Sequence, residues 1–348
     1  MRCKGISFFR KKQYLCKKKI RFLMKIVGIG NALVDKLHLL TDDTLLSELH
    51  LDKGSMTLID QATQHHIDHL LSSRSPRITP GGSAANTILA LAHMGAQCAY
   101  IGMTGSDSMG ALYASSMQEA GVQPHIIRSA QHTGIANTLI SPDGQRTFAT
   151  YLGAAAHLSP QDITTAMLDD ASLLHLEGYL VQNHDLIEHI CHIAKTKGLS
   201  ISLDLGSYNI VSSDHDFFHH LVRTYVDIVF ANQEEAQAYT HHDDPTQAIS
   251  AILHDSHTAV VKLGAEGAIS QTADMPHPIR VPAIHIDNLI DTTAAGDYFA
   301  AGYLWAYTQH KDIQTSLQTG TILASHIIQE VGAQLSPQTW DKILKVFF

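Results

Sequence analysis

The stretch Asp291-Thr-Thr-Ala-Ala-Gly-Asp297 has the residue types of a phosphate-binding helix start, and the apolar run 298–307 follows it at once. Small residues at the start of a helix leave backbone N–H groups free at the positive end of the helix dipole, where they can hold an anion. Asp297 can accept a proton from an alcohol while these groups stabilise a transferring phosphoryl group. The pattern indicates phosphoryl transfer to a hydroxyl, although an ordinary helix start with acidic first-turn residues explains the same letters.

Polar residues that can bind a sugar follow the first expected strand. Asn31 and Asp35 come directly after Gly28-Ile-Gly30, and an ionised Asp35 can accept hydrogen bonds from two hydroxyls. A dinucleotide-binding fingerprint would need a third small residue where Leu33 stands, so a Rossmann nucleotide site is disfavoured. We interpret Asn31 and Asp35 as groups delivered at the carboxyl end of a strand, with a helix-capping role for Asp35 as the alternative.

A second candidate loop is Gly81-Gly82-Ser83-Ala-Ala-Asn86, at the start of an expected helix. Adjacent glycines let the backbone approach a ligand closely, and Asn86, one turn into the helix, offers both a donor and an acceptor. These features suit a ligand with several hydroxyls. A Gly-Gly turn needed only for packing is the alternative.

Two later strand ends carry residues suited to a nucleotide. Asn232 and Glu235 lie at a strand end and in the first helical turn beyond it. Their oxygens can hold water molecules of a Mg²⁺ ion that nucleotide phosphates bind, and a helix cap explains the same residues. Lys262, Gly264 and Gly267 form a glycine turn after another strand, either as the edge of a nucleotide site or as a simple hairpin.

Composition narrows the class of protein. The 348 residues are 45% hydrophobic, enough for one large α/β domain or two smaller ones. The four cysteines have neither metal nor disulfide spacing, which suits a reducing compartment such as the cytoplasm and argues against zinc. No apolar run of about 18 residues occurs, so we expect no membrane span. The 24 histidines lie mostly in polar stretches, and we expect them on the surface without a metal.

Charge is distributed unevenly along the chain. Residues 1–23 contain nine Lys or Arg and no acid, whereas residues 24–348 contain 15 basic and 33 acidic residues. The acidic body argues against nucleic acid as a partner. The basic segment lacks the apolar core and cleavage site of a secretory signal. Because Met24 opens a clean strand, we expect the native start there, with residues 1–23 disordered or not native.

From Met24 onward, short apolar runs alternate with helical patterns. This alternation predicts an α/β fold with a doubly wound, mainly parallel sheet and helices on both faces, in one domain over 24–348. The expected strands are 25–30, 97–103, 172–177, 199–205, 226–231 and 257–263, and helices with readable ends are expected at 84–93 and 184–197.

The alternation breaks between Thr133 and Leu152, where Pro142-Asp-Gly-Gln145 joins two β-rich runs. Such a hairpin cannot belong to a parallel succession of strands and helices. We therefore predict an accessory sheet built from segments at about 36–60 and 125–152. A sheet of this kind can close over a substrate as a lid and exclude water, although an edge hairpin without a function is the alternative.

With these residues in place, the chain resembles the ribokinase/PfkB family of carbohydrate and nucleoside kinases over essentially all of 24–345. Six motifs in the family's order carry the resemblance: Gly28-x-Gly-Asn31-x-x-x-Asp35, Gly81-Gly-Ser-x-x-Asn86, Gly105-x-Asp107-x-x-Gly110, Asn232-x-x-Glu235, Lys262-Leu-Gly-x-x-Gly267 and Asp291-Thr-x-x-Ala-Gly-Asp297. P-loop and protein-kinase motifs do not occur. The resemblance implies a ribokinase-like fold with a small β-sheet lid, and an ATP-dependent kinase that requires Mg²⁺.

The resemblance also implies roles for the matching residues. The base would be Asp297, and the anion hole would be formed by the N–H groups of Ala294, Ala295, Gly296 and Asp297. The substrate would be bound by Asn31, Asp35, Gly82, Ser83, Asn86 and Glu177. The Mg-phosphate end would be served by Asn232 and Glu235, and the nucleotide would be lined by Lys262, Gly264 and Gly267. The commonest family form has glycine in place of Ala294, so the hole requires dihedral angles there that suit a non-glycine residue.

Asn31, the strand end Leu176–Leu180 and the hairpin Asp143-Gly-x-Arg146 are most similar to the adenosine-kinase-like branch. We therefore expect transfer of the γ-phosphoryl group to a primary hydroxyl of a ribose-type nucleoside, with adenosine favoured. The alternatives are a ribokinase- or fructokinase-type sugar kinase, an NAD-dependent dehydrogenase and a non-catalytic purine or sugar sensor. Both a monomer and a lid-mediated homodimer, and activation by K⁺ bound near Asp291 and Thr293, stay open.

Overall fold

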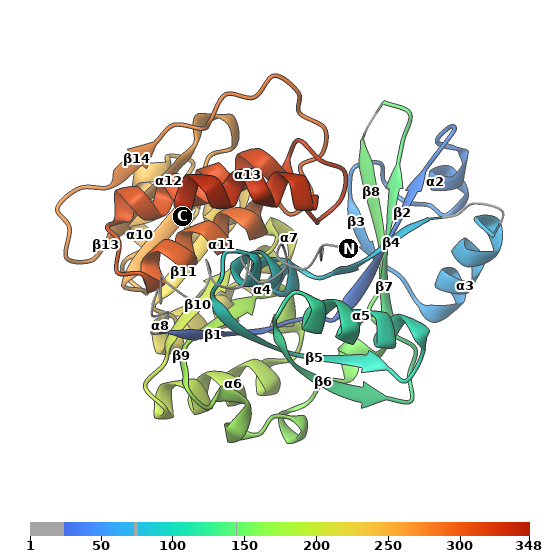
Figure 1. Cartoon of the computed structure of the whole chain (residues 1–348), viewed down its shortest axis with the longest axis horizontal. Helices are drawn as coiled ribbons and strands as arrows, with labels where there is room; N and C mark the ends of the chain where they lie inside the picture. The colour runs from blue at the N-terminus through green and yellow to red at the C-terminus, as the bar shows by residue number, and fades with distance from the viewer. Residues whose placement is uncertain (1–23, 73–75, 144) are drawn as a thin grey trace, which may run out of the picture.

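Two β-sheets of unequal size organise the protein. The structure is a computed structural model that describes residues 24–72, 76–143 and 145–348. The basic segment 1–23, for which we expected disorder or a non-native origin, lies outside the described residues. The smaller sheet lies beside the larger one, and each sheet packs against helices (Figure 1).

In the described part of the chain, nine strands form the larger sheet in the order β14-β13-β12-β11-β10-β9-β1-β5-β6. Their bounds are Lys25–Ile29 (β1), Gln97–Gly105 (β5), Gln123–Ser129 (β6), Ala171–Glu177 (β9), Ser200–Asp204 (β10), Ile228–Asn232 (β11), Thr258–Lys262 (β12), Ala268–Thr272 (β13) and Ile279–Val281 (β14). The run from β12 to β6 is parallel, and β13 and β14 are antiparallel. The inner parallel strands are largely apolar because both of their faces are buried, whereas the edge strand β6 is only partly buried. All six expected strands are confirmed.

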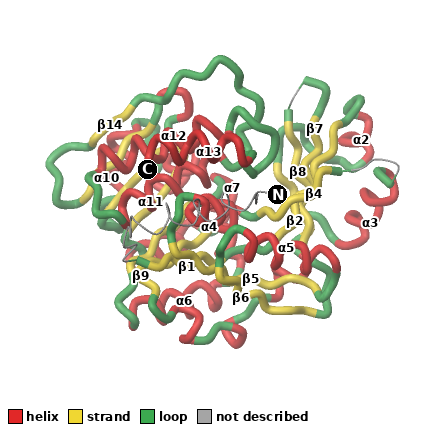
Figure 2. The backbone as a smooth tube through the Cα atoms, viewed as in Figure 1, coloured by secondary structure: helices red, strands yellow, loops and turns green. Residues whose placement is uncertain are grey.

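Helices cover both faces of the larger sheet, as predicted. One face packs against α6 (His184–Thr196), α8 (His215–Tyr225), α9 (Gln233–Thr240) and α10 (Pro245–Ile252). The other packs against α4 (Ser83–His93), α5 (Ser108–Glu119), α11 (Ala295–Thr308), α12 (Ile313–Ile327) and α13 (Pro337–Phe347). Figure 2 shows strands of the larger sheet between helices of the two layers, and α7 (Tyr208–Ser213) packs against α9. The cores on the two faces fix the strand ends that carry the candidate site.

The smaller sheet has the strand order β3-β8-β7-β2-β4 within the described residues. Its bounds are Leu33–Leu39 (β2), Met56–Leu58 (β3), Arg77–Gly81 (β4), Gly134–Ile140 (β7) and Arg146–Tyr151 (β8). The predicted hairpin is confirmed as the antiparallel pair β7 and β8. We refer to these five strands as the lid sheet.

The structure corrects the predicted boundaries of the accessory sheet. Residues 125–129 belong to β6 at the edge of the larger sheet, and β4 was not predicted as a lid strand. Asp35 lies within β2, paired with β4 and β7, and is neither a helix cap nor a group at the edge of the larger sheet. The reason is that β2 begins only a few residues after β1 and pairs with strands that are distant in sequence.

Helices close the outer face of the lid sheet. Leu46 of α2 (Thr44–Glu48) and Ile67 of α3 (Gln61–Leu70) form a small core with Leu139 and Ala149 of the sheet. Asn137 Nδ2 donates a buried hydrogen bond of 2.6 Å to Gln64 Oε1 in α3. Because side chains alternate along a strand, the opposite face is left to meet the larger sheet.

The motif Gly105-x-Asp107-x-x-Gly110 ties the larger sheet to the lid. Asp107 caps α5 by accepting from the Gly110 N–H at 2.9 Å, and it also accepts from the Thr133 N–H at 2.8 Å and the Thr133 hydroxyl at 2.6 Å. A Cβ atom at Gly110 would stand 2.2 Å from the Gly105 carbonyl oxygen. The motif therefore anchors the segment that enters β7.

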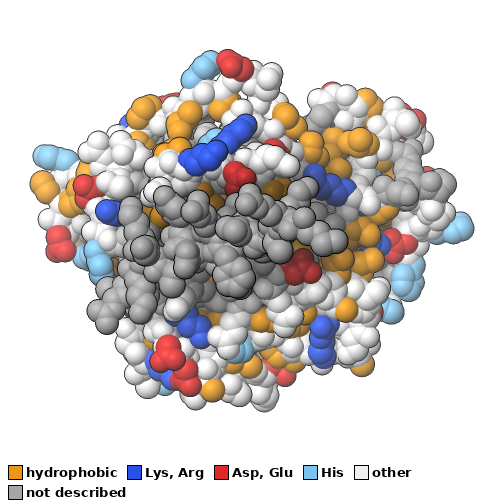
Figure 3. Space-filling model, in the orientation of Figure 1, with side chains coloured by type: hydrophobic (Ala, Val, Ile, Leu, Met, Phe, Trp, Pro, Cys, Tyr) orange, Lys and Arg blue, Asp and Glu red, His pale blue; other side chains and the backbone are white. Residues whose placement is uncertain are grey.

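Most described histidines are at least partly exposed, and several are visible at the left and right edges of the face in Figure 3. The expectation of a uniformly superficial set was wrong for His175 and His38, which are buried. The His175 ring pairs with the Ser202 hydroxyl at 2.9 Å, and burial lowers its pKa to about 4. Among the described residues, no helix is long and apolar enough to span a membrane.

Candidate active site

The start of α11 has the local structure that the sequence predicted, with one correction. Ala294 precedes the helix and adopts left-handed dihedral angles, φ 61° and ψ 8°. These angles favour glycine and do not meet the condition that they suit a non-glycine residue, so Ala294 carries strain of about 1 kcal/mol. The Ala295 N–H, one of the predicted anion-hole donors, donates to the Thr292 carbonyl oxygen at 3.1 Å. The N–H groups that follow it in the first turn still point out of the helix start, because that orientation follows from the backbone.

Asp297 lies in the first turn of α11 and is held by side chains of α4. Its Oδ1 atom accepts from the Ser83 hydroxyl at 2.7 Å, and its Oδ2 atom accepts from Asn86 Nδ2 at 2.9 Å. The Thr87 hydroxyl donates to the Asp297 carbonyl oxygen at 3.2 Å. Both substrate candidates in α4 thus orient the predicted base, and their contact with a substrate stays a prediction.

Burial raises the pKa of Asp297 to about 6, while the hydrogen bonds from Ser83 and Asn86 oppose the rise. Such a group is mostly deprotonated at neutral pH and still basic enough to take a proton from a hydroxyl.

The pH dependence of turnover tests this assignment. Because protonated Asp297 cannot act as the base, the pH–rate profile should have an acidic limb: below about pH 6, kcat/KM should fall about tenfold per pH unit. A pH–rate profile measures this limb, and a profile flat down to pH 4.5 would contradict the assignment.

A cavity of about 530 Å³ lies between the lid sheet and the carboxyl edge of the larger sheet. All six predicted substrate residues line it together with Asp297: Asn31, Asp35, Gly82, Ser83, Asn86 and Glu177. Apolar side chains line its lid side: Leu33, Met56, Leu58, Phe148 and Leu152. Burial, with a smaller effect of the nearby Asp297, raises the pKa of Asp35 to about 7. The cavity therefore joins a polar floor to an apolar wall.

Two glycines allow the β4–α4 turn to lie against β2. A Cβ atom at Gly81 would stand 2.2 Å from Asp35 Oδ1, and one at Gly82 would stand 2.3 Å from the Asn31 carbonyl oxygen. Gly82 also has a φ of 96°, which non-glycine residues rarely adopt. Close backbone approach thus explains the Gly-Gly pair, and it brings α4 next to Asp35.

Glu177 braces this turn from beneath. Its buried carboxylate accepts from the Asn31 N–H at 2.8 Å, from Asn31 Nδ2 at 2.9 Å and from the Ala84 N–H at 2.9 Å. Burial raises the pKa of Glu177 to about 7. A Cβ atom at Gly30 would stand 2.3 Å from Glu177 Oε2, so Gly30 serves this packing. Direct contact of Glu177 with a substrate stays a prediction.

A second cavity of about 510 Å³ lies on the other side of the α11 start. Lys262, Gly264 and Gly267 line it, as predicted for the nucleotide, next to apolar residues that include Ala283, Ile284, Ile286, Leu289 and Phe299. The Lys262–Gly267 turn also joins β12 to the antiparallel β13, so the hairpin interpretation is confirmed, and a role at the edge of a nucleotide site stays a prediction. An apolar slot of this size suits a planar base.

Asn232 and Glu235 line the first cavity, near its junction with the second. Asn232 caps α9: its Oδ1 atom accepts from the Glu235 N–H at 2.8 Å, and the Glu235 carboxylate accepts from the Asn232 N–H at 2.7 Å. Burial raises the pKa of Glu235 to about 7. The capping interpretation is confirmed, and a role toward Mg²⁺ stays a prediction.

The charges around the cavities fit a nucleotide-bound Mg²⁺. Five carboxylates line the first cavity, namely Asp35, Glu177, Asp204, Glu235 and Asp297, and the lone Lys or Arg among its described lining residues is Lys262. A divalent cation bound to a polyphosphate would reduce the charge repulsion between the phosphates and this acidic region. No cluster of three or more His, Cys, Asp or Glu residues suited to a metal occurs in the described ranges, so such an ion would take most of its ligands from phosphate and water.

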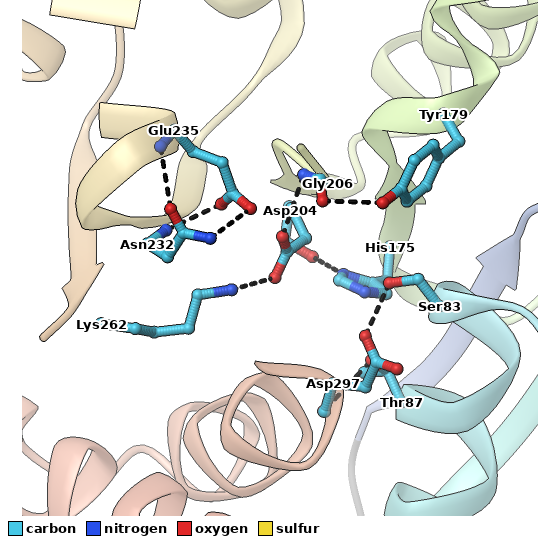
Figure 4. A network of polar contacts seen from close by, with 11 residues as sticks. Ser83, Thr87, His175, Tyr179, Asp204, Gly206, Asn232, Glu235, Lys262 and Asp297 are labelled. Atoms are coloured by element: carbon cyan, nitrogen blue, oxygen red, sulfur yellow. Dashed lines mark hydrogen bonds and ion pairs between the residues drawn. The ribbon is translucent and has the colours of Figure 1, made fainter. Parts of the chain in front are cut away.

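Three side-chain contacts of the site were not predicted. Lys262 Nζ pairs with Asp204 Oδ2 at 2.7 Å (Figure 4). Arg146 from the lid sheet pairs with the buried Asp291 and donates to the Thr293 hydroxyl at 2.9 Å. Asp204 ends β10 at the same edge as Asn232, and this signal could have found it. The predicted K⁺ position near Asp291 and Thr293 thus receives a guanidinium group, and K⁺ binding there stays a prediction.

Comparison with known proteins agrees with this geometry. Residues 52–340 match the family described as pfkB family carbohydrate kinase. A ribokinase of Haemophilus influenzae is 28% identical over 287 residues, covering 79% of this chain and 89% of that protein. An adenosine kinase of Saccharomyces cerevisiae is 27% identical over 329 residues, covering 88% of this chain and 95% of that protein.

Solved structures give the same result. The adenosine kinase of Sinorhizobium meliloti is similar, with a TM-score of 0.84 and 29% identity, over 93% of this chain and 99% of that chain. A probable sugar kinase of Rhizobium etli has the same TM-score at 30% identity. Since the family match covers most of the sequence and the fold is ribokinase-like, the chain belongs to the pfkB family of carbohydrate kinases and is a phosphotransferase with adenosine-kinase-like and ribokinase-like relatives.

Proposed function

We propose that this kinase transfers the γ-phosphoryl group of ATP to a primary hydroxyl of a ribose-type nucleoside, with adenosine as the favoured acceptor. The observation that carries the proposal is the position of Asp297 in a cavity with both a polar floor and an apolar wall. Asp35 and Asn31 suit ring hydroxyls, whereas Phe148 and Leu33 suit a planar base. Adenosine kinases among the relatives support this acceptor.

The proposed reaction is one displacement at phosphorus. Asp297 takes the proton of the acceptor hydroxyl, and the hydroxyl oxygen forms a bond to the γ-phosphorus. The bond between that phosphorus and the β–γ bridging oxygen breaks, and ADP leaves with the electron pair. The first-turn N–H groups of α11 stabilise the charge on the transferring group. A closed lid sheet excludes water, which would otherwise compete as the acceptor.

The cation and the assembly state are further parts of the proposal. Mg²⁺ bound to the ATP phosphates would be held through water by Glu235 and Asn232. We favour a monomer, because α2 and α3 cover the outer face of the lid sheet and leave no bare sheet there for a lid-mediated homodimer. The buried free thiols of Cys98 and Cys191 are compatible with the proposed cytoplasmic location.

An ADP-release assay with adenosine, inosine, ribose and fructose tests the acceptor. The proposal expects the highest kcat/KM with adenosine and dependence on added Mg²⁺. A preference for free ribose or fructose would favour the sugar-kinase alternative, which the similarity to a ribokinase supports. Adenosine binding without any ADP release would favour the sensor.

Truncation of the apolar wall should separate nucleosides from sugars. Phe148→Ala removes the aromatic ring that lines the lid side of the cavity. Contact between a base and an aromatic ring is worth about 1–3 kcal/mol, so kcat/KM for adenosine should fall roughly 10- to 100-fold. Activity with ribose at high concentration is the matched control, because a sugar without a base does not reach the wall. Equal losses with both acceptors would contradict the placement of the base.

A further inference from the structure

The two cavities meet at the start of α11. Lys262, Gly264, Thr292, Ala295 and Gly296 line both of them. In a kinase, the transferring phosphoryl group passes from donor to acceptor, so it must lie where the two binding spaces meet. The residues at this junction are therefore candidates for contact with the phosphoryl group during its transfer.

Lys262 is the one Lys or Arg among the described residues that line either cavity. Its ammonium group lies over the first turn of α11, because a Cβ atom at Gly296 would stand 3.0 Å from Nζ. The backbone N–H groups of that turn face the same space. The junction thus combines N–H groups of a helix start with one full positive charge.

Asp204 fixes the direction of this side chain. Lys262 comes from the end of β12 and reaches Asp204 at the end of β10, with a distance of 2.7 Å between Nζ and Oδ2. Figure 4 shows the pair between the Asn232–Glu235 cap and Asp297. The side chains of Lys262 and Asp204 are only 14% and 7% exposed, so the ion pair is largely shielded from solvent.

We propose that Lys262 is a catalytic residue whose ammonium group contacts the non-bridging oxygens of the transferring γ-phosphoryl group, and that Asp204 is the positioning residue that holds it there. This assignment rests on the proposed kinase reaction and adds to the anion hole and the base. As negative charge spreads over the phosphoryl oxygens in the transition state, a fixed ammonium group stabilises them more than it stabilises bound ATP.

The same pair acts in opposite senses on the base. The Lys262 charge lowers the pKa of Asp297, and the Asp204 charge raises it. Ser83 and Asn86 of α4 also face Asp297, and its charge acts on Asp35 of β2, Glu177 at the end of β9, Tyr179 beyond it and Tyr298 of α11. The side chains of these other groups are retained when Lys262 or Asp204 is replaced, and among them the Asp204 charge also raises the pKa of Tyr179.

Nucleotide binding tests the contact without any acceptor. Lys262→Met should weaken binding of the non-hydrolysable analogue AMP-PNP at least tenfold and leave ADP binding within twofold, measured by calorimetry with Mg²⁺. Lys262→Arg, which keeps the charge, should retain most of the AMP-PNP affinity. Equal losses for ADP and AMP-PNP, or no loss for either, would overturn the proposal. Because no acceptor is present, a wrong choice of nucleoside leaves this result unaffected.

Turnover and its pH dependence test the catalytic role. Lys262→Met should lower kcat about 10²- to 10³-fold, which is the loss seen in other enzymes when one oxyanion-hole donor is removed. The same variant should move the acidic limb of the kcat/KM profile to higher pH. Asp204→Asn should move that limb to lower pH. Lys262→Met leaves the buried Asp204 carboxylate without a partner, and this variant can unfold for that reason. The double variant Lys262→Met/Asp204→Asn removes both charges, so the loss of kcat can still be measured on a folded protein. Limbs that move in the same direction, or an unchanged kcat, would refute the assignment.

Discussion

Replacing Asp297 with asparagine should lower kcat by about 10²- to 10⁴-fold while the protein stays folded. Asparagine has nearly the same shape and keeps the oxygen that accepts from Ser83 or Asn86, whose donors lie 2.7 Å and 2.9 Å from the carboxylate. It cannot take a proton from the acceptor hydroxyl, so the chemical step loses its base. Because the loss is confined to that step, KM for the acceptor should change much less than kcat.

The matched control is Asp312→Asn. Asp312 also stands at a helix start, where it caps α12 by accepting from the Thr315 N–H at 2.7 Å, but it lines neither cavity. This variant should retain full turnover. ADP release measures both variants, and circular dichroism and thermal unfolding establish that each is folded. Unchanged turnover in Asp297→Asn would remove Asp297 from the base role, and the proposed reaction with it.

Replacing Glu177 with alanine should cost roughly 3 kcal/mol of folding free energy or more, because three N–H donors lose their acceptor and each buried unsatisfied group costs about 1–3 kcal/mol. These donors belong to Asn31, in the loop between β1 and β2, and to Ala84, at the start of α4, next to the floor of the substrate cavity. Urea unfolding measures the loss of stability. KM for the acceptor should rise as well, since the floor loses its support.

The variant Glu177→Gln separates support from substrate binding. Glutamine keeps one carbonyl oxygen for the two Asn31 donors but turns an amide N–H₂ group toward the Ala84 N–H. We therefore expect a stability between those of Glu177→Ala and the unmodified protein. If Glu177 mainly binds substrate, both variants should instead raise KM while the free energy of unfolding stays unchanged, and the bracing role would then be wrong.

Local sequence patterns were sufficient for two parts of the site, one at a strand end and one at a helix start. Asn232 with Glu235 forms a capping box, and Asp297 lies in the first turn of α11, as their spacing indicated. The six inner parallel strands were predictable because burial on both faces requires continuous apolar runs, whereas the edge strand β6, which is only partly buried, was not predicted. Since the carboxyl ends of parallel strands meet at one edge, these local features also predicted that the residues would gather there.

The tertiary structure alone decided how the groups meet. Ser83 and Asp297 are 214 residues apart, and the Lys262–Asp204 and Arg146–Asp291 pairs likewise join distant segments. Asp35 belongs to the lid sheet because β2 pairs with β4 and β7, a choice that no local periodicity encodes. Residue type and spacing thus determined which groups this protein can use for chemistry. The order of the strands, the packing of α4 against α11 and the burial of charge determined which groups touch, because these depend on contacts between segments far apart in the chain.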